Sequence, residues 1–177
     1  GLLIINPDNP TGAVYPRSVL EQIVAIAKEY GLFLIADEIY ANLAYDKTSF
    51  VSLAELAGDV PTMIMRGLSK EVPWPGSRCG WVEFYNTDVD PSFARYAKSI
   101  EDAKMNEVCA TTLPQAVLPK ILSDRRYESH LQSRRSKYKA RAQTAVQIFR
   151  ENKNIHVVEP KGAFYLSVVF DQDYTKL

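Results

Sequence analysis

Cysteine and histidine are both scarce in this chain of 177 residues, which has two of each. The two cysteines, Cys79 and Cys109, belong to no metal-binding or redox motif, and so we expect a reduced, cytoplasmic setting. His130 and His156 stand apart, without the spacing of metal ligands, and so the sequence predicts no metal site.

Net charge is absent as well, because 21 lysines and arginines balance 21 acidic residues. Bulk charge therefore gives no reason to expect a nucleic-acid partner. Basic residues do gather between residues 125 and 141. We interpret this stretch as a solvated helix face, because no pattern of stacking aromatic residues accompanies it.

Long apolar runs are missing too. No stretch approaches the ~18 apolar residues that a membrane-spanning helix needs, and no signal peptide is visible, so we expect no membrane partner. The remaining composition is that of an ordinary globular protein, with 46% apolar and 24% charged residues. The chain starts directly in an apolar run, without an initiator methionine, and so we expect it to be a piece of a longer protein.

Short apolar runs predict the strands of an α/β fold. The runs at Leu2–Ile5, Leu32–Asp37, Thr62–Ser69 and Cys79–Tyr85 are typical of strands that are buried on both faces. Apolar residues at helical spacing separate the first two runs. Ser18 and Glu21 could form a capping box at the start of that helix, and Gly31 ends it.

The second half of the chain is mostly helical by pattern. Helices are predicted at about Pro91–Glu107, near Pro114–Leu122, and at about Arg125–Asn152, and Pro119 should kink or end the middle one. The run "NIHVVEPKGAFYLSVVF" then predicts two strands that are broken at Pro160–Gly162.

Polar side chains mark the ends of the predicted strands. Asn9 follows the first strand, Asp37 ends the second with Tyr40 close behind, Lys70 ends the third, and Arg78 precedes the fourth. Alone, each has an ordinary explanation as a turn, cap, packing or surface residue. Ligands bind beyond the carboxyl ends of strands in open α/β sheets, and so the joint pattern favours one shared site.

The loop "NPDNPTG", which carries Asn9, is unusually stiff. Pro7 and Pro10 each fix their own φ and restrict the residue before them. A rigid corner at the end of a strand indicates a side chain that must be aimed, and Asn9 is the candidate.

These motifs resemble the fold-type I pyridoxal phosphate enzymes of the class I/II aminotransferase family. "NPDNPTG" is similar to the family's Asn-Pro-Thr-Gly loop, and "ADEIYANLAYD" to its Asp-Glu-hydrophobic-Tyr segment. "GLSKEVPWPGSRCGW" is similar to its Ser-Lys segment followed by Gly-x-Arg-x-Gly, although Gly67 stands where many members have a phosphate-binding serine. "PKGAFY" resembles the family's small domain more loosely.

The resemblance implies an arrangement of the whole chain. It implies part of the mixed, mostly parallel large-domain sheet of this α/β fold, with the strands side by side in chain order. The large, cofactor-binding domain would cover residues 1–90, a connecting helix 91–110, and part of a small α+β domain 111–177. The full-length protein would be a homodimer.

The resemblance also implies the cofactor, pyridoxal 5'-phosphate, and a role for each marked residue. Lys70 would form the Schiff base and move the proton, and Asp37 would pair with the pyridine nitrogen. Asn9 and Tyr40 would hydrogen-bond the ring's 3-oxygen, and Arg78 would bind the phosphate. Lys70, Asp37 and Tyr40 are the predicted catalytic residues. The Asn9–Pro10 bond is expected to be cis.

The function implied is transfer of an amino group between an amino acid and a 2-oxo acid, in amino acid metabolism. A carbon–sulfur β-lyase or a decarboxylase would share every motif, and only transamination needs a 2-oxo acid acceptor. A third alternative is the effector-binding, aminotransferase-like domain of a transcription regulator. The family's ring-stacking aromatic residue and substrate-carboxylate arginine fall outside these 177 residues, so the piece alone is expected to be inactive.

Overall fold

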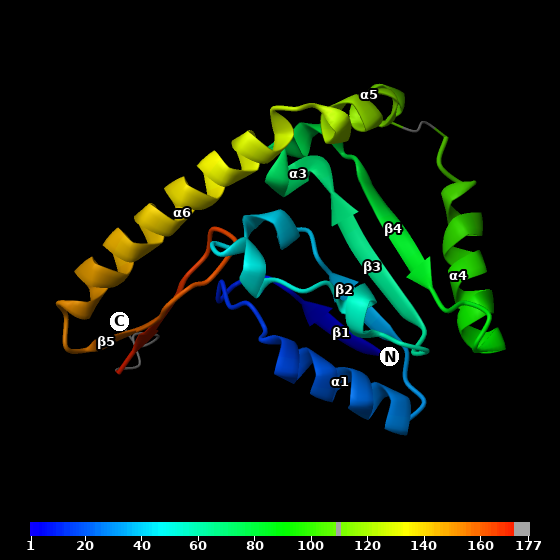
Figure 1. Cartoon of the computed structure of the whole chain (residues 1–177), viewed down its shortest axis with the longest axis horizontal. Coiled ribbons are helices and arrows are strands. Elements are labelled where there is room, and N and C mark those ends of the chain that lie inside the picture. Colours follow the sequence, from blue (N-terminus) through cyan, green and yellow to red (C-terminus); the bar gives the residue numbers. More distant parts are fainter. Residues whose placement is uncertain (109–110, 172–177) are drawn as a thin grey trace.

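A four-stranded sheet forms the centre of the computed structural model, which describes residues 1–108 and 111–171 (Figure 1). Its strands lie side by side in chain order, β1, β2, β3 and β4. The first three are parallel and β4 is antiparallel to β3, which confirms the mixed, mostly parallel α/β sheet. The strands are β1 (Leu2–Ile5), β2 (Leu34–Asp37), β3 (Thr62–Gly67) and β4 (Gly80–Tyr85).

Helices α1 (Arg17–Glu29) and α2 (Leu53–Leu56) enclose the main hydrophobic core on one face of the sheet. Leu34 and Ala36 of β2 point into this core. Successive side chains of a strand point to opposite faces, and so Asp37 points to the other face. This alternation decides on which side of the sheet a site at the strand ends can form.

The start of α1 differs from the predicted capping box. The helix begins at Arg17, Pro16 precedes it in extended conformation, and no side chain caps it. Ser18 already lies inside the first turn and therefore cannot act as the cap. The predicted end at Gly31 is confirmed, because this glycine adopts φ +59° directly after the helix, a conformation that suits a helix C-terminus.

Helix α4 (Pro91–Lys104) follows the sheet and ends before the predicted Glu107. The Asp90 carboxylate caps its first turn through the Ser92 N–H at 2.7 Å. Phe93 is buried and packs against Phe33 and Phe84, at ring-centroid distances of 5.4 and 6.4 Å. These rings attach α4 to the sheet.

Two further helices and a hairpin complete the described chain. They are α5 (Thr112–Ser123), α6 (Tyr127–Arg150), β5 (Ile155–Val158) and β6 (Ser167–Phe170). Pro119 was predicted to kink or end this helix; it does not end it, because α5 continues to Ser123. Proline has no N–H to donate to the carbonyl four residues earlier, which is that of Gln115. Pro119 and Gln115 are both exposed, so this carbonyl can bond to water.

The last predicted strand is shorter than its apolar pattern suggests. Residues 160–165 bond to the loops of the large sheet: the Gly162 N–H donates to the Gly12 carbonyl at 2.9 Å, and the Ala163 N–H to that of Leu43 at 3.2 Å. Backbone groups used in this way cannot pair in the hairpin, and so β6 begins only at Ser167.

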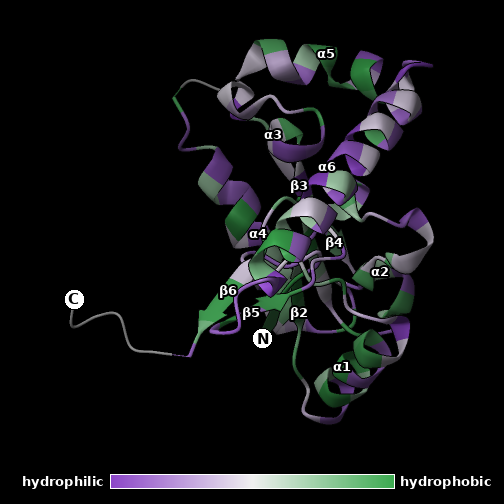
Figure 2. Ribbon diagram, turned by 90° about the vertical axis from the view of Figure 1, so that its left-hand side faces the viewer, coloured by the Kyte–Doolittle hydropathy of each residue, from purple (hydrophilic) through white to green (hydrophobic). Residues whose placement is uncertain are grey.

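Helix α6 is largely hydrophilic, whereas hydrophobic residues concentrate in the strands of the sheet (Figure 2). The interpretation of residues 125–141 as a solvated face is nevertheless wrong for two of them. Arg135 is only 7% exposed and pairs with Glu128 at 2.8 Å. Arg134 is half-buried and bonds to the Lys70 carbonyl. Arg135 Nη1 also donates to the Asn42 carbonyl at 3.4 Å, and so both arginines join α6 to segments that follow strands of the large sheet.

Within the described ranges, no helix is both long and apolar enough to cross a membrane. The same residues contain no cluster of His, Cys, Asp or Glu that could hold a metal ion. Cys79 is buried with a free thiol, and Cys109 lies outside the described residues. The division into domains at 1–90, 91–110 and 111–177 stays a prediction.

Candidate functional site

A cavity of about 370 Å³ opens at the carboxyl ends of the parallel strands, on the face away from α1. All five residues that the sequence marked line this cavity, although they come from four separate segments: Asn9, Asp37, Tyr40, Lys70 and Arg78. The predicted convergence on one site is therefore observed. Their individual roles stay predictions.

The loop that carries Asn9 is held from several sides. Both the Asn6–Pro7 and the expected Asn9–Pro10 peptide bonds are cis. The buried Asn6 side chain accepts the Tyr15 N–H at 3.0 Å. Gly12 adopts φ +71°, and a Cβ there would lie 2.5 Å from Pro160 Cβ, so only glycine fits. These contacts hold the loop in one conformation, in which Asn9 lines the cavity.

Asp37 lies at the end of β2, where strand alternation points it into the cavity. One of its carboxylate oxygens, Oδ1, accepts the Ile39 N–H at 3.0 Å. This local bond is the structural role that a strand-end aspartate often has. The second oxygen has no hydrogen bond within the described part of the chain and remains available to a ligand.

Tyr40 is 3% exposed, and its hydroxyl lies 2.8 Å from that of Tyr165. Burial raises the pKa of Tyr40 above its ordinary value, and the bond to Tyr165 and the nearby Asp37 charge raise it further. A hydrogen bond with the Asn9 side chain acts in the opposite direction. The phenol therefore keeps its proton at neutral pH and can donate it in a hydrogen bond.

The sequence suggested that Lys70 ends the third strand. Lys70 lies instead on the single helical turn α3 (Leu68–Glu71), directly after β3. Its Nζ is 5.8 Å from the centre of the Tyr40 ring and 5.7 Å from that of Phe164. Among the described residues, this amine forms no hydrogen bond or ion pair. It therefore faces the cavity beside two aromatic rings, with no carboxylate to hold it.

Arg78 follows the 3₁₀ turn η3 (Pro75–Ser77) and is exposed. Its Nη1 donates to the Pro75 carbonyl at 2.8 Å, which curls the side chain back over its own turn. Within residues 1–108 and 111–171 its other guanidinium N–H groups have no hydrogen-bond partner, and a guanidinium that lines the cavity is well suited to bind phosphate oxygens.

Sequence reasoning missed two aromatic neighbours of the site. Phe164 and Tyr165 follow the irregular segment at 160–163 and bring their rings against Tyr40, at centroid distances of 5.5 and 5.6 Å. The run "PKGAFY" was a signal for them, but nothing local shows that Tyr165 meets a residue 125 positions earlier.

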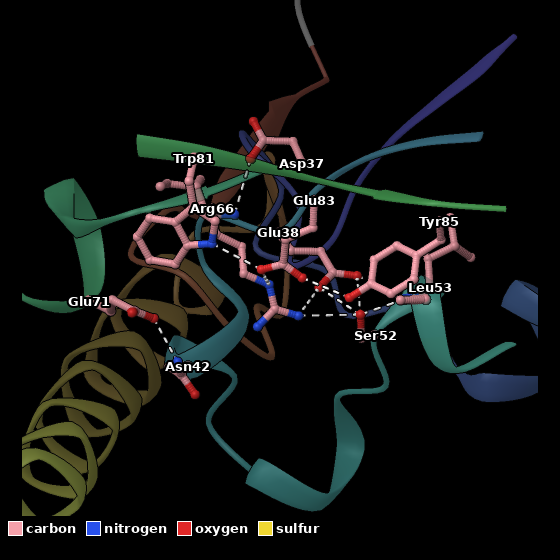
Figure 3. A network of polar contacts seen from close by, with 12 residues as sticks. Asp37, Glu38, Asn42, Ser52, Leu53, Arg66, Glu71, Trp81, Glu83 and Tyr85 are labelled. Atoms are coloured by element: carbon pink, nitrogen blue, oxygen red, sulfur yellow. Dashed lines mark hydrogen bonds and ion pairs between the residues drawn. The ribbon is translucent and has the colours of Figure 1, made fainter. Parts of the chain in front are cut away.

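A second missed feature is the buried network behind Asp37 (Figure 3). Glu38 points to the opposite side, where it accepts the Leu53 N–H at 2.8 Å and Arg66 Nη2 at 2.7 Å. Ser52 Oγ also donates to its carboxylate. Burial raises the pKa of Glu38, and the Leu53 bond and the Arg66 charge counteract this rise. The network anchors the end of β2 to β3 and α2.

Comparisons with known proteins give this site its family. The family described as "Aminotransferase class I and II" matches residues 1–177, and its members use pyridoxal phosphate. An uncharacterized aminotransferase of Methanocaldococcus jannaschii is 48% identical over 98% of the chain. The glutamate-pyruvate aminotransferase AlaA of Escherichia coli is 31% identical over 94% of it.

Solved structures agree. An alanine aminotransferase from Pyrococcus furiosus superposes on 98% of the chain with a TM-score of 0.86 and 32% identity. The chain covers 43% of that structure and 40% of each of the two relatives above, so it spans about two-fifths of their length. On this evidence the chain belongs to the class I and II aminotransferase family.

Proposed function

We propose that the protein is a pyridoxal phosphate-dependent aminotransferase, which moves an amino group between an amino acid and a 2-oxo acid. The observation that carries this proposal is the placement of Lys70, Asp37 and Arg78 around one cavity. The names of the relatives, which include glutamate-pyruvate and tyrosine aminotransferases, support transamination over lyase or decarboxylase chemistry.

The side chains present fit the cofactor. Lys70 offers a primary amine without a partner among the described residues, as an aldehyde requires. Asp37 has a free carboxylate oxygen for a pyridine N–H, and the guanidinium of Arg78 suits a phosphate. Asn9 and Tyr40 contribute neutral polar groups that suit the ring's 3-oxygen. The cavity therefore offers an amine, a carboxylate, a guanidinium and neutral polar groups. These match the aldehyde, the pyridine nitrogen, the phosphate and the 3-oxygen of one cofactor molecule.

When bound, pyridoxal phosphate supplies an electron sink for the negative charge that remains when an amino acid loses its Cα proton. The chain's own residues do the rest. Once the substrate's amine has displaced it from the cofactor, Lys70 Nζ would be free to accept that proton and to return it to a carbon of the cofactor. Asp37 would pair with the protonated pyridine nitrogen, and its carboxylate is held in place because Oδ1 accepts the Ile39 N–H. Tyr40, which keeps its proton, would orient the ring through its hydroxyl.

A homodimer in the cytoplasm is part of the same proposal. Its support is the family to which the chain belongs. Light scattering of the purified full-length protein should give twice the monomer mass, and a monomer at all concentrations would contradict the proposal.

The proposed function is tested by trapping. The full-length protein is mixed with pyridoxal phosphate, reduced with borohydride and digested, and the labelled peptide is identified by mass spectrometry. We expect the label on Lys70. A label only on other lysines would overturn the assignment.

A second arm separates the possible reactions. The protein with cofactor is incubated with a panel of amino acids, with and without a 2-oxo acid acceptor. Turnover that requires the acceptor supports transamination. Turnover that proceeds without it, with release of carbon dioxide or of a sulfur-containing product, would show a decarboxylase or lyase instead.

A further inference from the structure

Helix α6 contacts the turn that carries Lys70 at three points. Arg134 Nη2 donates to the Lys70 carbonyl at 2.9 Å. The Tyr127 hydroxyl donates to Glu71 Oε1 at 2.6 Å, and His130 Nε2 lies 3.3 Å from the Glu71 carbonyl. All three side chains come from one helix, and all reach the two residues at the end of α3.

Glu71 is a buried carboxylate with both oxygens occupied. It is 7% exposed, and Asn42 Nδ2 donates to Oε2 at 2.6 Å while Tyr127 occupies Oε1 (Figure 3 shows the Asn42 bond). Burial and the bond to Glu71 raise the pKa of Tyr127, which therefore remains a proton donor. With both oxygens used, Glu71 serves to hold the chain in place and has no free oxygen for proton transfer.

The turn α3 needs such support because it has only four residues. The last carbonyl groups of any helix have no partner within the helix, and one isolated turn is unstable in water. Arg134 supplies the missing donor for the Lys70 carbonyl. Because it carries a full charge, this hydrogen bond is stronger than one between neutral groups.

Arg134 is itself fixed by its neighbours. Its Nη2 donates to the Tyr138 hydroxyl at 2.7 Å, and its guanidinium carbon lies 5.1 Å from the centre of the Tyr138 ring. The Tyr138 ring lies 5.6 Å from Phe164, the ring that flanks Lys70 Nζ. The contacts therefore continue from α6 to both ends of the lysine, its carbonyl and its amine.

We propose that Arg134, and Glu71 with Tyr127, are positioning residues that fix the backbone of Lys70 so that its amine points into the cavity. None of them lines the cavity, and so they act through Lys70. This inference rests on the proposed role of Lys70 as the cofactor-binding residue.

The test measures the rate of borohydride trapping of pyridoxal phosphate at Lys70, relative to trapping at surface lysines in the same sample. The variants are Arg134→Ala, Arg134→Lys and Tyr127→Phe, with Ser136→Ala on the exposed face of α6 as the control. We expect the relative rate to fall about tenfold in Arg134→Ala, in line with loss of one charged hydrogen bond. Arg134→Lys should recover most of it, and Tyr127→Phe should slow it about threefold.

Steady-state kinetics give the second measurement. Because the positioning residues touch no substrate, kcat should fall in the variants while KM for the amino acid stays within about twofold. Unfolding midpoints show which variants are folded. If Arg134→Ala does not fold, Arg134→Lys and Tyr127→Phe decide the question.

The outcomes separate the two proposals. Absence of label at Lys70 in the unmodified protein contradicts the proposed function. Normal labelling there, with folded variants that trap at the same relative rate as Ser136→Ala, overturns the positioning role and leaves the function in place.

Discussion

The sheet segment, residues 1–85, and the helical and hairpin segment, residues 111–171, contribute differently to the same cavity. The first supplies the chemically distinctive groups, such as Asp37, Tyr40 and Lys70, from the end of β2, from the residues just after it and from the turn α3 that follows β3. The second supplies Tyr165 and Arg134, which bond to those groups or to their backbone. A segment whose single, looser motif is "PKGAFY" therefore fixes the residues that carry the clearer motifs. If this division is correct, substitutions in the first segment should remove chemistry, and those in the second should reduce its efficiency.

The largest effect is expected from Lys70→Ala. Loss of the only amine that faces the cavity among the described residues should abolish trapping at this position and lower kcat by about a thousandfold or more, since a positioned group cannot be replaced by one from solution. The measurement is transamination of the purified variant, with Lys120→Ala as the control. Activity near the parental level would mean that the chemistry of the first segment has been misassigned.

Asp37→Asn should remove chemistry while leaving the cofactor bound. An asparagine keeps the size of the side chain but removes the charge that would hold a proton on the pyridine nitrogen. We expect normal trapping at Lys70 and a fall in kcat of roughly a hundredfold, as for loss of one electrostatic contact. Asp88→Asn, an exposed substitution, is the control. If the variant turns over substrate at the parental rate, Asp37 has only a structural role, through its hydrogen bond with the Ile39 N–H.

Tyr165→Phe tests the second segment. It removes one hydrogen bond from Tyr40 and should lower turnover by about fivefold to tenfold. Tyr165 raises the pKa of Tyr40, so the variant's Tyr40 should titrate at lower pH. Phenolate absorbance, recorded against pH without cofactor, measures this shift, and the exposed Tyr30→Phe is the control. Titration of Tyr40 at higher pH in the variant would contradict the hydrogen bond between Tyr40 and Tyr165.

The smallest effect concerns the network behind the site. Glu38→Gln should lower the free energy of unfolding by about 1–3 kcal/mol, because the amide nitrogen cannot accept the hydrogen bonds that Glu38 Oε2 accepts from Ser52 and Arg66. The pKa of Glu38 is raised above its ordinary 4.5 in the folded protein. The parent therefore loses stability as pH rises from 4.5 through the folded value, whereas the variant lacks this loss.

The difference in stability between parent and Glu38→Gln should accordingly narrow with rising pH across that window. Denaturant unfolding between pH 4 and 8, about the range that brackets the ordinary carboxyl pKa, measures it. Glu55→Gln, exposed on α2, is the control. A difference that widens instead would show that the ion pair with Arg66 outweighs the cost of burial.

The sequence predicted the sheet and the convergence of the five marked residues on one cavity, because both depend on local rules. Strand alternation and strand ends place Asp37, and the fixed φ of its prolines stiffens the loop of Asn9. Tyr165 and Arg134 depend instead on contacts across 125 and 64 positions, which no local pattern contains. Arg134 has the same charge as the exposed Lys137 three positions later, and only packing distinguishes them.

Gly12 has a consequence for engineering. Its carbonyl accepts the Lys161 and Gly162 N–H groups at 2.7 and 2.9 Å, and its missing Cβ leaves room for Pro160 and the Tyr165 carbonyl. The Asn-Pro-Thr-Gly loop and residues 160–165 are therefore two halves of one unit, although they lie at opposite ends of the chain. A loop transplanted alone into another scaffold would lose its geometry, so a working graft would need to carry both halves.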